Sequence, residues 1–96
     1  MSSKYTDELV SILKMLKNIE EDLNLIQYSE TEKKIYYTIA CKNANDGSCC
    51  ISDVIEESGF SRSTVYKTIK KFEQANLVYI KQSQGDKREF NLILAN

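Results

Sequence analysis

The middle of the chain holds two short helical segments separated by a glycine turn, in the stretch DVIEESGFSRSTVYKTIKKF. Glycine readily takes the left-handed backbone conformation that ends a helix, so Gly59 should terminate the first segment. We also expect the turn to be so tight that a side chain at this position would be in the way. Ser61 can cap the second helix, which would run to about Ala75. At steps of four and three residues, that helix would bury Val65, Ile69 and Phe72.

Two further helices are predicted before this unit. Apolar residues recur at alternating steps of three and four from about Asp7 to Gln27, which predicts a long first helix. Ser29 and Glu32 are spaced as a capping box, which would open a second helix through about Lys42. The inner face of the second helix would hold Ile35, Tyr36, Ile39 and Ala40.

A turn cluster and a brief extended segment lie between the second helix and the helix-glycine-helix unit. The letters NANDGS at 43–48 are typical turn residues, with Gly47 placed for a positive φ. The letters CCI at 49–51 would form a short strand. Ser52 can then cap the short helix DVIEES.

The last twenty residues alternate in the manner of a β-hairpin. LVYIKQ at 77–82 and REFNLIL at 88–94 would be strands joined by a turn at 83–87, and Asn76 can take the left-handed position after the preceding helix. Phe90, Leu92 and Leu94 would give the returning strand an apolar face. Because 96 residues suffice for one modest core, we predict a single domain, mainly α with a small β-sheet (α+β).

Positive charge is concentrated in the C-terminal part of the chain, although the formal net charge is only −1. Residues 1–60 carry 6 Lys against 11 Asp or Glu, a net charge of −5. Residues 61–96 carry 7 Lys or Arg against 3 Asp or Glu, a net charge of +4. Such asymmetry is expected of a chain that presents one face to a polyanion.

Several classes of function lack the residues that they require. The chain has no histidine, no phosphate-cradling glycine loop and no strand-turn-helix nucleophile, so we predict no enzyme, metal site or cofactor. No apolar run approaches the roughly 18 to 20 residues of a membrane span, and the N-terminus lacks a signal-peptide pattern. We therefore expect a cytoplasmic protein.

Three cysteines, Cys41, Cys49 and Cys50, are predicted to be small, partly buried apolar side chains; redox-sensing thiols are the alternative. Neighbouring residues on a strand point to opposite faces. At least one of Cys49 and Cys50 should therefore be accessible.

A short helix, a glycine turn and a capped second helix make a helix-turn-helix unit, whose second helix can enter a DNA major groove about 12 Å wide. Val54, Phe60 and Val65 would lock the two helices together. The groove-facing surface would take its donors and acceptors from Arg62, Ser63, Thr64, Tyr66 and Lys67. The alternative is an ordinary solvated helix, with Tyr66 partly buried beside Phe72.

The segments DVIEESGFSRSTVYKTIKKFEQANLV and QGDKREFNLIL resemble the winged helix-turn-helix of MarR-type transcription regulators, and the resemblance covers roughly residues 29–95. The family's recognition helix starts with Ser-x-Ser-Thr-Val, which is matched by Ser61, Ser63, Thr64 and Val65. The family's wing has Asp-x-Arg before alternating apolar residues, which is matched by Asp86, Arg88, Phe90, Leu92 and Leu94. The resemblance implies that Arg88 enters the minor groove and that Asp86 orients it. A salt bridge of Arg88 with Asp86 or Glu89 is the alternative.

Members of this family continue into C-terminal helices that build the dimer and often part of an effector pocket, whereas this chain ends at Asn96. A small-molecule effector is therefore doubtful, and the first helix is the predicted dimerisation element. Its seam would consist of Leu9, Ile12, Leu16, Ile19, Leu23 and Ile26. We expect this helix to bury one flank in its own core and to offer another to a second copy; intramolecular packing alone is the alternative.

We thus predict one domain over residues 1–96, with an N-terminal helix at 1–28 and a DNA-binding winged helix at 29–96. It would bind duplex DNA sequence-specifically at the nucleoid and regulate transcription, with the recognition helix in the major groove and the wing in the minor groove. The predicted DNA-binding residues are Ser52, Ser61, Arg62, Ser63, Thr64, Tyr66, Lys67, Lys70, Lys81, Lys87 and Arg88. The rival interpretation is a winged-helix module that docks another protein through its acidic N-terminal half and binds DNA weakly or not at all.

Overall fold

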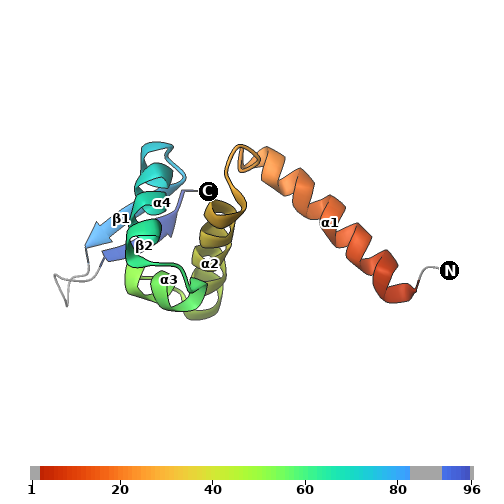
Figure 1. Ribbon diagram of the computed structural model, residues 1–96, viewed down its shortest axis with the longest axis horizontal. Coiled ribbons are helices and arrows are strands. Elements are labelled where there is room, and N and C mark those ends of the chain that lie inside the picture. Colours follow the sequence, from red (N-terminus) through yellow and green to blue (C-terminus); the bar gives the residue numbers. More distant parts are fainter. Residues whose placement is uncertain (1–2, 83–89, 96) are drawn as a thin grey trace.

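The computed structural model describes residues 3–82 and 90–95 of the chain (Figure 1). Within these residues, four helices and a two-stranded antiparallel sheet follow in the order α1 Lys4–Asp22, α2 Glu30–Asp46, α3 Ile51–Ser58, α4 Arg62–Gln74, β1 Val78–Gln82 and β2 Phe90–Leu94. The last five elements form the body of the molecule, and α1 projects away from it. The predicted α+β class, with its long N-terminal helix, is confirmed.

The core of the body lies between α2, α3, α4 and the sheet. Helix α2 packs against α3, α4 and β2, and α4 also packs against β1. Phe72 of α4 is fully buried and meets Tyr28 and Tyr36 edge-on, at ring-centroid distances of 5.2 and 5.8 Å. The inner faces predicted for α2 and α4 are buried at Ile35, Tyr36, Ile39, Val65, Ile69 and Phe72, and Ala40 is partly buried.

The predicted helix caps of α2 and α4 are confirmed. Ser29 and Glu32 form the capping box of α2, in which the Glu32 N–H donates to Ser29 Oγ at 3.1 Å and the Ser29 N–H donates to Glu32 Oε1 at 2.8 Å. Ser61 caps α4. Left-handed backbone conformations occur at Gly47, Gly59 and Asn76, with φ values of 77°, 76° and 60°.

Helix α2 is longer than predicted, because it continues past Lys42 to Asp46 and absorbs most of the expected turn cluster. Two side-chain contacts explain the extension. Lys42 Nζ lies 2.8 Å from Asp46 Oδ2 one helical turn later, and Asn43 Nδ2 donates to the Leu92 carbonyl oxygen at 3.3 Å. These contacts favour helix over turn until Gly47 ends it.

Helix α1 differs most from its prediction, because it ends at Asp22 instead of Gln27. Asn24 takes a left-handed conformation with φ 59°, and the chain then turns so that Leu25 is fully buried in the core. Ile26 therefore lies beyond the helix, off the predicted seam. No side chain of α1 is buried, so the expectation that one flank packs into its own core is wrong.

Helix α3 starts at Ile51 with Cys50 as its N-cap, so the predicted cap at Ser52 is wrong. The reason is Asp53, whose Oδ2 accepts from the Cys50 N–H at 3.2 Å and thereby places the cap three residues upstream. Ser52 lies exposed in the first turn. The predicted strand CCI is reduced to a single bridge between Cys50 and Asn91, next to a bond from the Leu92 N–H to the Cys49 carbonyl oxygen at 2.7 Å.

The sheet pairs β1 and β2 in the register Val78↔Leu94, Ile80↔Leu92 and Gln82↔Phe90. Val78 and Leu92 are buried against α4 and α2, whereas Phe90 and Leu94 are partly buried, so the predicted apolar face is confirmed. The predicted turn at 83–87 lies outside the described residues.

Candidate nucleic-acid interface

The turn between α3 and α4 fixes the start of α4, the helix that carries the predicted groove-facing residues. Val54 and Val65 are fully buried across the turn, and Phe60 packs partly against the same core, as predicted. A Cβ built on Gly59 would meet no described heavy atom within 4 Å. The steric reason for glycine at this position is therefore wrong, and the positive φ of 76° is the reason that remains.

The N-terminus of α4 collects hydroxyl groups. Ser61 Oγ accepts from the Thr64 N–H at 3.3 Å and donates to Thr64 Oγ1 at 2.9 Å. Ser63 Oγ lies 3.3 Å from the same Ser61 oxygen. Because the first N–H groups of a helix and its macrodipole favour anions, this end of α4 suits a phosphate or a base-edge acceptor.

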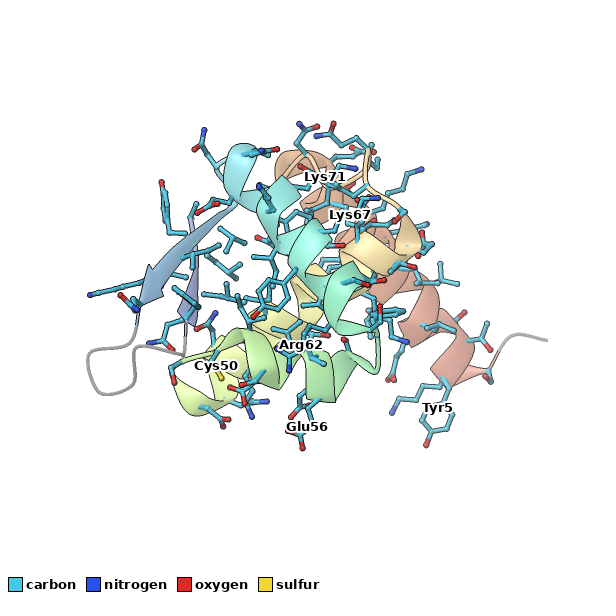
Figure 2. All side chains as sticks on the ribbon, turned by 60° about the vertical axis from the view of Figure 1, so that its left-hand side comes forward. Tyr5, Cys50, Glu56, Arg62, Lys67 and Lys71 are labelled. Atoms are coloured by element: carbon cyan, nitrogen blue, oxygen red, sulfur yellow. The ribbon has the colours of Figure 1, made fainter. Side chains whose placement is uncertain are left out.

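One face of α4 is exposed along its whole length. Arg62 stands beside the turn, with Lys67 and Lys71 further along the helix (Figure 2). Tyr66 is 43% exposed, so its hydroxyl is accessible although part of its ring is covered. Ser63 and Lys70 are also exposed on this face, and Thr64 is half-buried. The structure therefore brings the predicted α4 residues together on one surface.

The cations of the body fall into a paired and an unpaired group. Lys42 Nζ lies 2.8 Å from Asp46 Oδ2, and Lys71 Nζ lies 2.8 Å from Glu32 Oε2. In residues 3–82 and 90–95, by contrast, no carboxylate forms an ion pair with Arg62, Lys67, Lys70 or Lys81. These four unpaired cations lie on α4 and on the exposed side of β1, where their charge is available to a polyanion. Lys34 of α2 also has no carboxylate partner among the described residues, and its Nζ lies 5.9 Å from the centroid of the Phe60 ring.

A groove of about 710 Å³ runs beside α4, between this helix and the N-terminus of α2. Lys67, Lys70 and Lys71 line one wall, and Ser29 and Thr31 line the other. Ser29, Thr31 and Lys71 also belong to this surface, although they are not among the residues predicted from the sequence. The capping box at Ser29 is visible in the sequence, but only the packing of α2 against α4 shows that it borders the exposed face of α4.

The remaining predicted residues lie apart from α4 or outside the described residues. Lys81 is exposed on β1, and Ser52 is exposed in the first turn of α3, where its Oγ lies 3.0 Å from Cys50 Sγ. Asp86, Lys87 and Arg88 fall in 83–89, outside the described residues, as does Glu89.

The three cysteines agree with their prediction only in part. Cys49 and Cys50 are both buried and Cys41 is exposed, so the expected accessible partner within the Cys49–Cys50 pair is absent. The cause is that Cys50 is the N-cap of α3 and not part of a strand, so the side chains of Cys49 and Cys50 need not point to opposite faces. Burial and then the nearby Asp53 raise the pKa of the Cys49 thiol to about 12, so this group stays protonated.

Among the described residues, no group of three or more His, Cys, Asp or Glu side chains could hold a metal ion. None of the helices in that same part of the chain is both long and apolar enough to cross a membrane.

Comparisons with known structures identify the fold. The heme sensor PefR of Streptococcus agalactiae, in complex with heme, superposes with a TM-score of 0.61 at 18% sequence identity, covering 98% of this chain and 65% of PefR. The S. aureus MepR–DNA complex gives 0.59 at 17% identity, covering 98% of this chain and 66% of MepR. Reduced AbfR bound to DNA gives 0.61 at 14% identity, covering 97% and 68%. The chain thus spans about two thirds of the length of these structures.

The likeness to these three structures confirms the predicted winged helix-turn-helix fold and is consistent with the MarR type. A search among curated proteins finds no significant match. The family described as "Sugar-specific transcriptional regulator TrmB" matches residues 23–94, which include α2 to α4 and both strands. The chain is therefore a winged helix-turn-helix transcription regulator and belongs to the TrmB family.

Proposed function

We propose that the chain regulates transcription as a homodimer that binds duplex DNA, with α4 of each copy in a major groove. The observation that carries this proposal is the face of α4. It is exposed, polar and rich in cations without carboxylate partners in the described residues, while the opposite face is fixed in the core by Val65, Ile69 and Phe72. DNA in the comparison structures of MepR and AbfR supports the same assignment.

The proposed roles follow from position on the molecule. Arg62, Ser63, Thr64, Tyr66 and Lys67 would contact base edges, because they occupy the N-terminal half of the exposed face. Ser52, Ser61 and the N-terminus of α4 would hold phosphates. Lys67, Lys70, Lys81 and Lys87 would attract the phosphate backbone. Arg88 would enter the minor groove with Asp86 orienting it, by resemblance to the wing of the MarR type.

Salt dependence and one matched pair of variants test DNA binding. Fluorescent duplex of random sequence should bind at low salt and weaken steeply as salt rises. Arg62→Ala should weaken binding to a site selected from a random pool by about 1–3 kcal/mol if Arg62 contacts a base. Lys14→Ala, which removes one positive charge from exposed α1, is the control and should leave affinity within about twofold. Undetectable binding at low salt, or an unchanged affinity for both variants, would refute the proposal.

The exposed apolar side chains of α1 support dimerisation. Leu9, Ile12 and Ile19 are 55%, 61% and 47% exposed, and Tyr5, Val10, Leu13 and Met15 are exposed beside them. An apolar helix face of this extent is expected to be covered by a partner. A second copy of α1 would cover it with Leu9, Ile12, Leu16 and Ile19. Leu23, the C-cap of α1, is instead partly buried against the core of its own chain.

Sedimentation at micromolar concentration decides the oligomeric state. Ile12→Glu should convert the dimer to a monomer, because it places a charge inside the seam. Asn18→Glu adds the same charge on a part of α1 that the helical repeat places away from the seam, and it should leave the dimer intact. A monomeric wild-type protein would refute dimerisation.

Selection of bound duplexes from a random pool would define the DNA site. Two half-sites about 10 base pairs apart, or a multiple of that, are expected for a dimer. Such a protein would act in the cytoplasm, at the nucleoid. The second candidate function is docking of another protein on the acidic part of the chain, which the net charge of −5 over residues 1–60 favours. That function predicts binding of a partner protein that weakens as salt rises, with weak or no binding of duplex DNA.

A further inference from the structure

The direction in which α1 leaves the body is set at a single corner. Apart from Glu20 near its end, helix α1 packs against no other described element, and none of its residues is fully buried. A helix of 19 residues is about 28 Å long. Tilting it by about 10° at the corner would move its far end by about 5 Å. Whatever holds the corner therefore decides where α1 points.

An apolar plug holds the chain after α1. Leu25 is fully buried and Tyr28 is nearly so, with its ring edge-on to Phe72. The Leu25 N–H donates to the Glu20 carbonyl oxygen at 2.7 Å, and Asn24 between them supplies the left-handed turn. This plug anchors the connecting segment in the core. By itself, however, it fixes one end of α1 and leaves rotation about that end open.

A polar contact at Glu20 supplies the second anchor. The Glu20 carboxylate accepts a hydrogen bond from the Tyr37 hydroxyl of α2 and lies 3.7 Å from Lys33 Nζ. Tyr37 and Lys33 are one helical turn apart on α2, so a single side chain of α1 is held at two points along α2. The Glu20 and Lys33 side chains are only 12% and 14% exposed, respectively, so water competes weakly for the contact.

Burial first, and then the Glu20 carboxylate, raise the pKa of Tyr37, which keeps the phenol protonated as the donor. Lys33 Nζ also lies 3.0 Å from Glu30 Oε1, which holds the ammonium group beside Glu20. The group formed by Glu20, Tyr37 and Lys33, here called the corner latch, thus joins the end of α1 to the outer face of α2.

We propose that Glu20, held by Tyr37 and Lys33, is a positioning residue that fixes the angle of α1 to the body and thereby the half-site spacing that the dimer accepts. This inference rests on the proposed dimer. If two copies pair through α1, the two recognition helices are connected only through the two corners. A base-pair step advances the duplex by about 3.4 Å. A displacement of about 5 Å at the end of α1 therefore corresponds to more than one step.

The test compares Glu20→Gln and Tyr37→Phe with the neighbouring control Glu21→Gln, whose side chain is exposed. Each protein is titrated with duplexes that carry two selected half-sites at spacings varied by single base pairs. Wild type and Glu21→Gln should prefer one spacing at least about tenfold over those one or two base pairs away. The two latch variants should retain less than about threefold preference, with unchanged affinity for an isolated half-site.

A second readout does not depend on DNA. Residual dipolar couplings of backbone amides report the orientation of α1 relative to the body. In wild type, α1 and the body should fit one alignment tensor, whereas in the latch variants the couplings of α1 should shrink relative to those of the body. Circular dichroism confirms that the variants are folded.

The outcomes separate the two proposals. A wild-type monomer in sedimentation refutes the dimer and, with it, any role of Glu20 in spacing. A wild-type dimer whose latch variants keep the same sharp spacing preference and the same couplings refutes the positioning role alone.

Discussion

Replacement of Gly59 by alanine separates two reasons for a glycine in the turn before the recognition helix. The structure leaves open space for a Cβ at this position, but φ is 76°. A left-handed conformation costs an L-residue about 1–2 kcal/mol, and the loss of unfolded-state entropy on Gly→Ala returns about 0.4–1 kcal/mol. The free energy of unfolding should therefore fall by about 1 kcal/mol.

Urea denaturation of wild type and Gly59→Ala measures this difference, and the melting temperature should fall by about 4–8 °C. Gly47→Ala is a matched control, because its φ is 77° and its Cβ would also meet nothing within 4 Å. Gly59→Asn should cost less than Gly59→Ala, since asparagine tolerates this conformation, as it does at Asn24 and Asn76. A loss above about 3 kcal/mol for Gly59→Ala, with a small loss for Gly47→Ala, would refute the reasoning and restore a steric requirement in the turn.

Three further predictions concern the core, the acid limit of stability and the thiols. Leu25→Ala should lower the free energy of unfolding by about 2–5 kcal/mol, whereas exposed Ile26→Ala should change it by less than about 0.5 kcal/mol. Equal losses in urea denaturation would contradict the burial of Leu25 after α1. The Lys71 ammonium and then the Ser29 N–H lower the pKa of Glu32 from 4.5, so its stabilising contribution is present above that pH and is lost below it. Glu32→Gln should therefore cost at most about 1 kcal/mol at pH 7, and this cost should shrink as the pH falls below 4.5; a constant difference would contradict this. In the native protein, alkylation followed by mass spectrometry should label Cys41 first, and first labelling at Cys49 or Cys50 would contradict their burial.

The helix-turn-helix could be predicted from the sequence because its signals are local. Gly59 and Ser61 act through their own backbone conformation and a side chain that reaches three residues ahead. Such features are decided within one turn of helix, and the apolar steps of α4 then leave one possible buried face. The exposed face of α4 is then predicted as well, because it lies opposite the buried face of the same helix.

The predicted end of α1 and the predicted cap of α3 were wrong because a plausible local signal competed with another contact. The apolar repeat of α1 would continue through Ile26 if the helix did. Leu25 falls outside this repeat and is buried in the core that contains Phe72. Burying Leu25 requires the chain to turn at Asn24, so the helix ends early. The phase of Leu25 and the asparagine before it were the available signals. In the same way, Ser52 is a good cap in isolation, but the spacing of Cys50 and Asp53 forms the capping box that is observed.

Some acidic side chains pair with other residues in the folded molecule, whereas several cations of α4 do not. Glu32 neutralises Lys71 at the edge of the groove, and Glu20 takes part in the corner latch, so both carboxylates act as structural partners. Among the described residues, Arg62, Lys67 and Lys70 of α4 are left without an ion-pair partner. An overall charge near zero therefore does not count against contact with phosphate, because the acids that balance the sum lie largely on α1, α2 and α3. The sign of the local field at α4 depends on which carboxylates lie within about a Debye length of it.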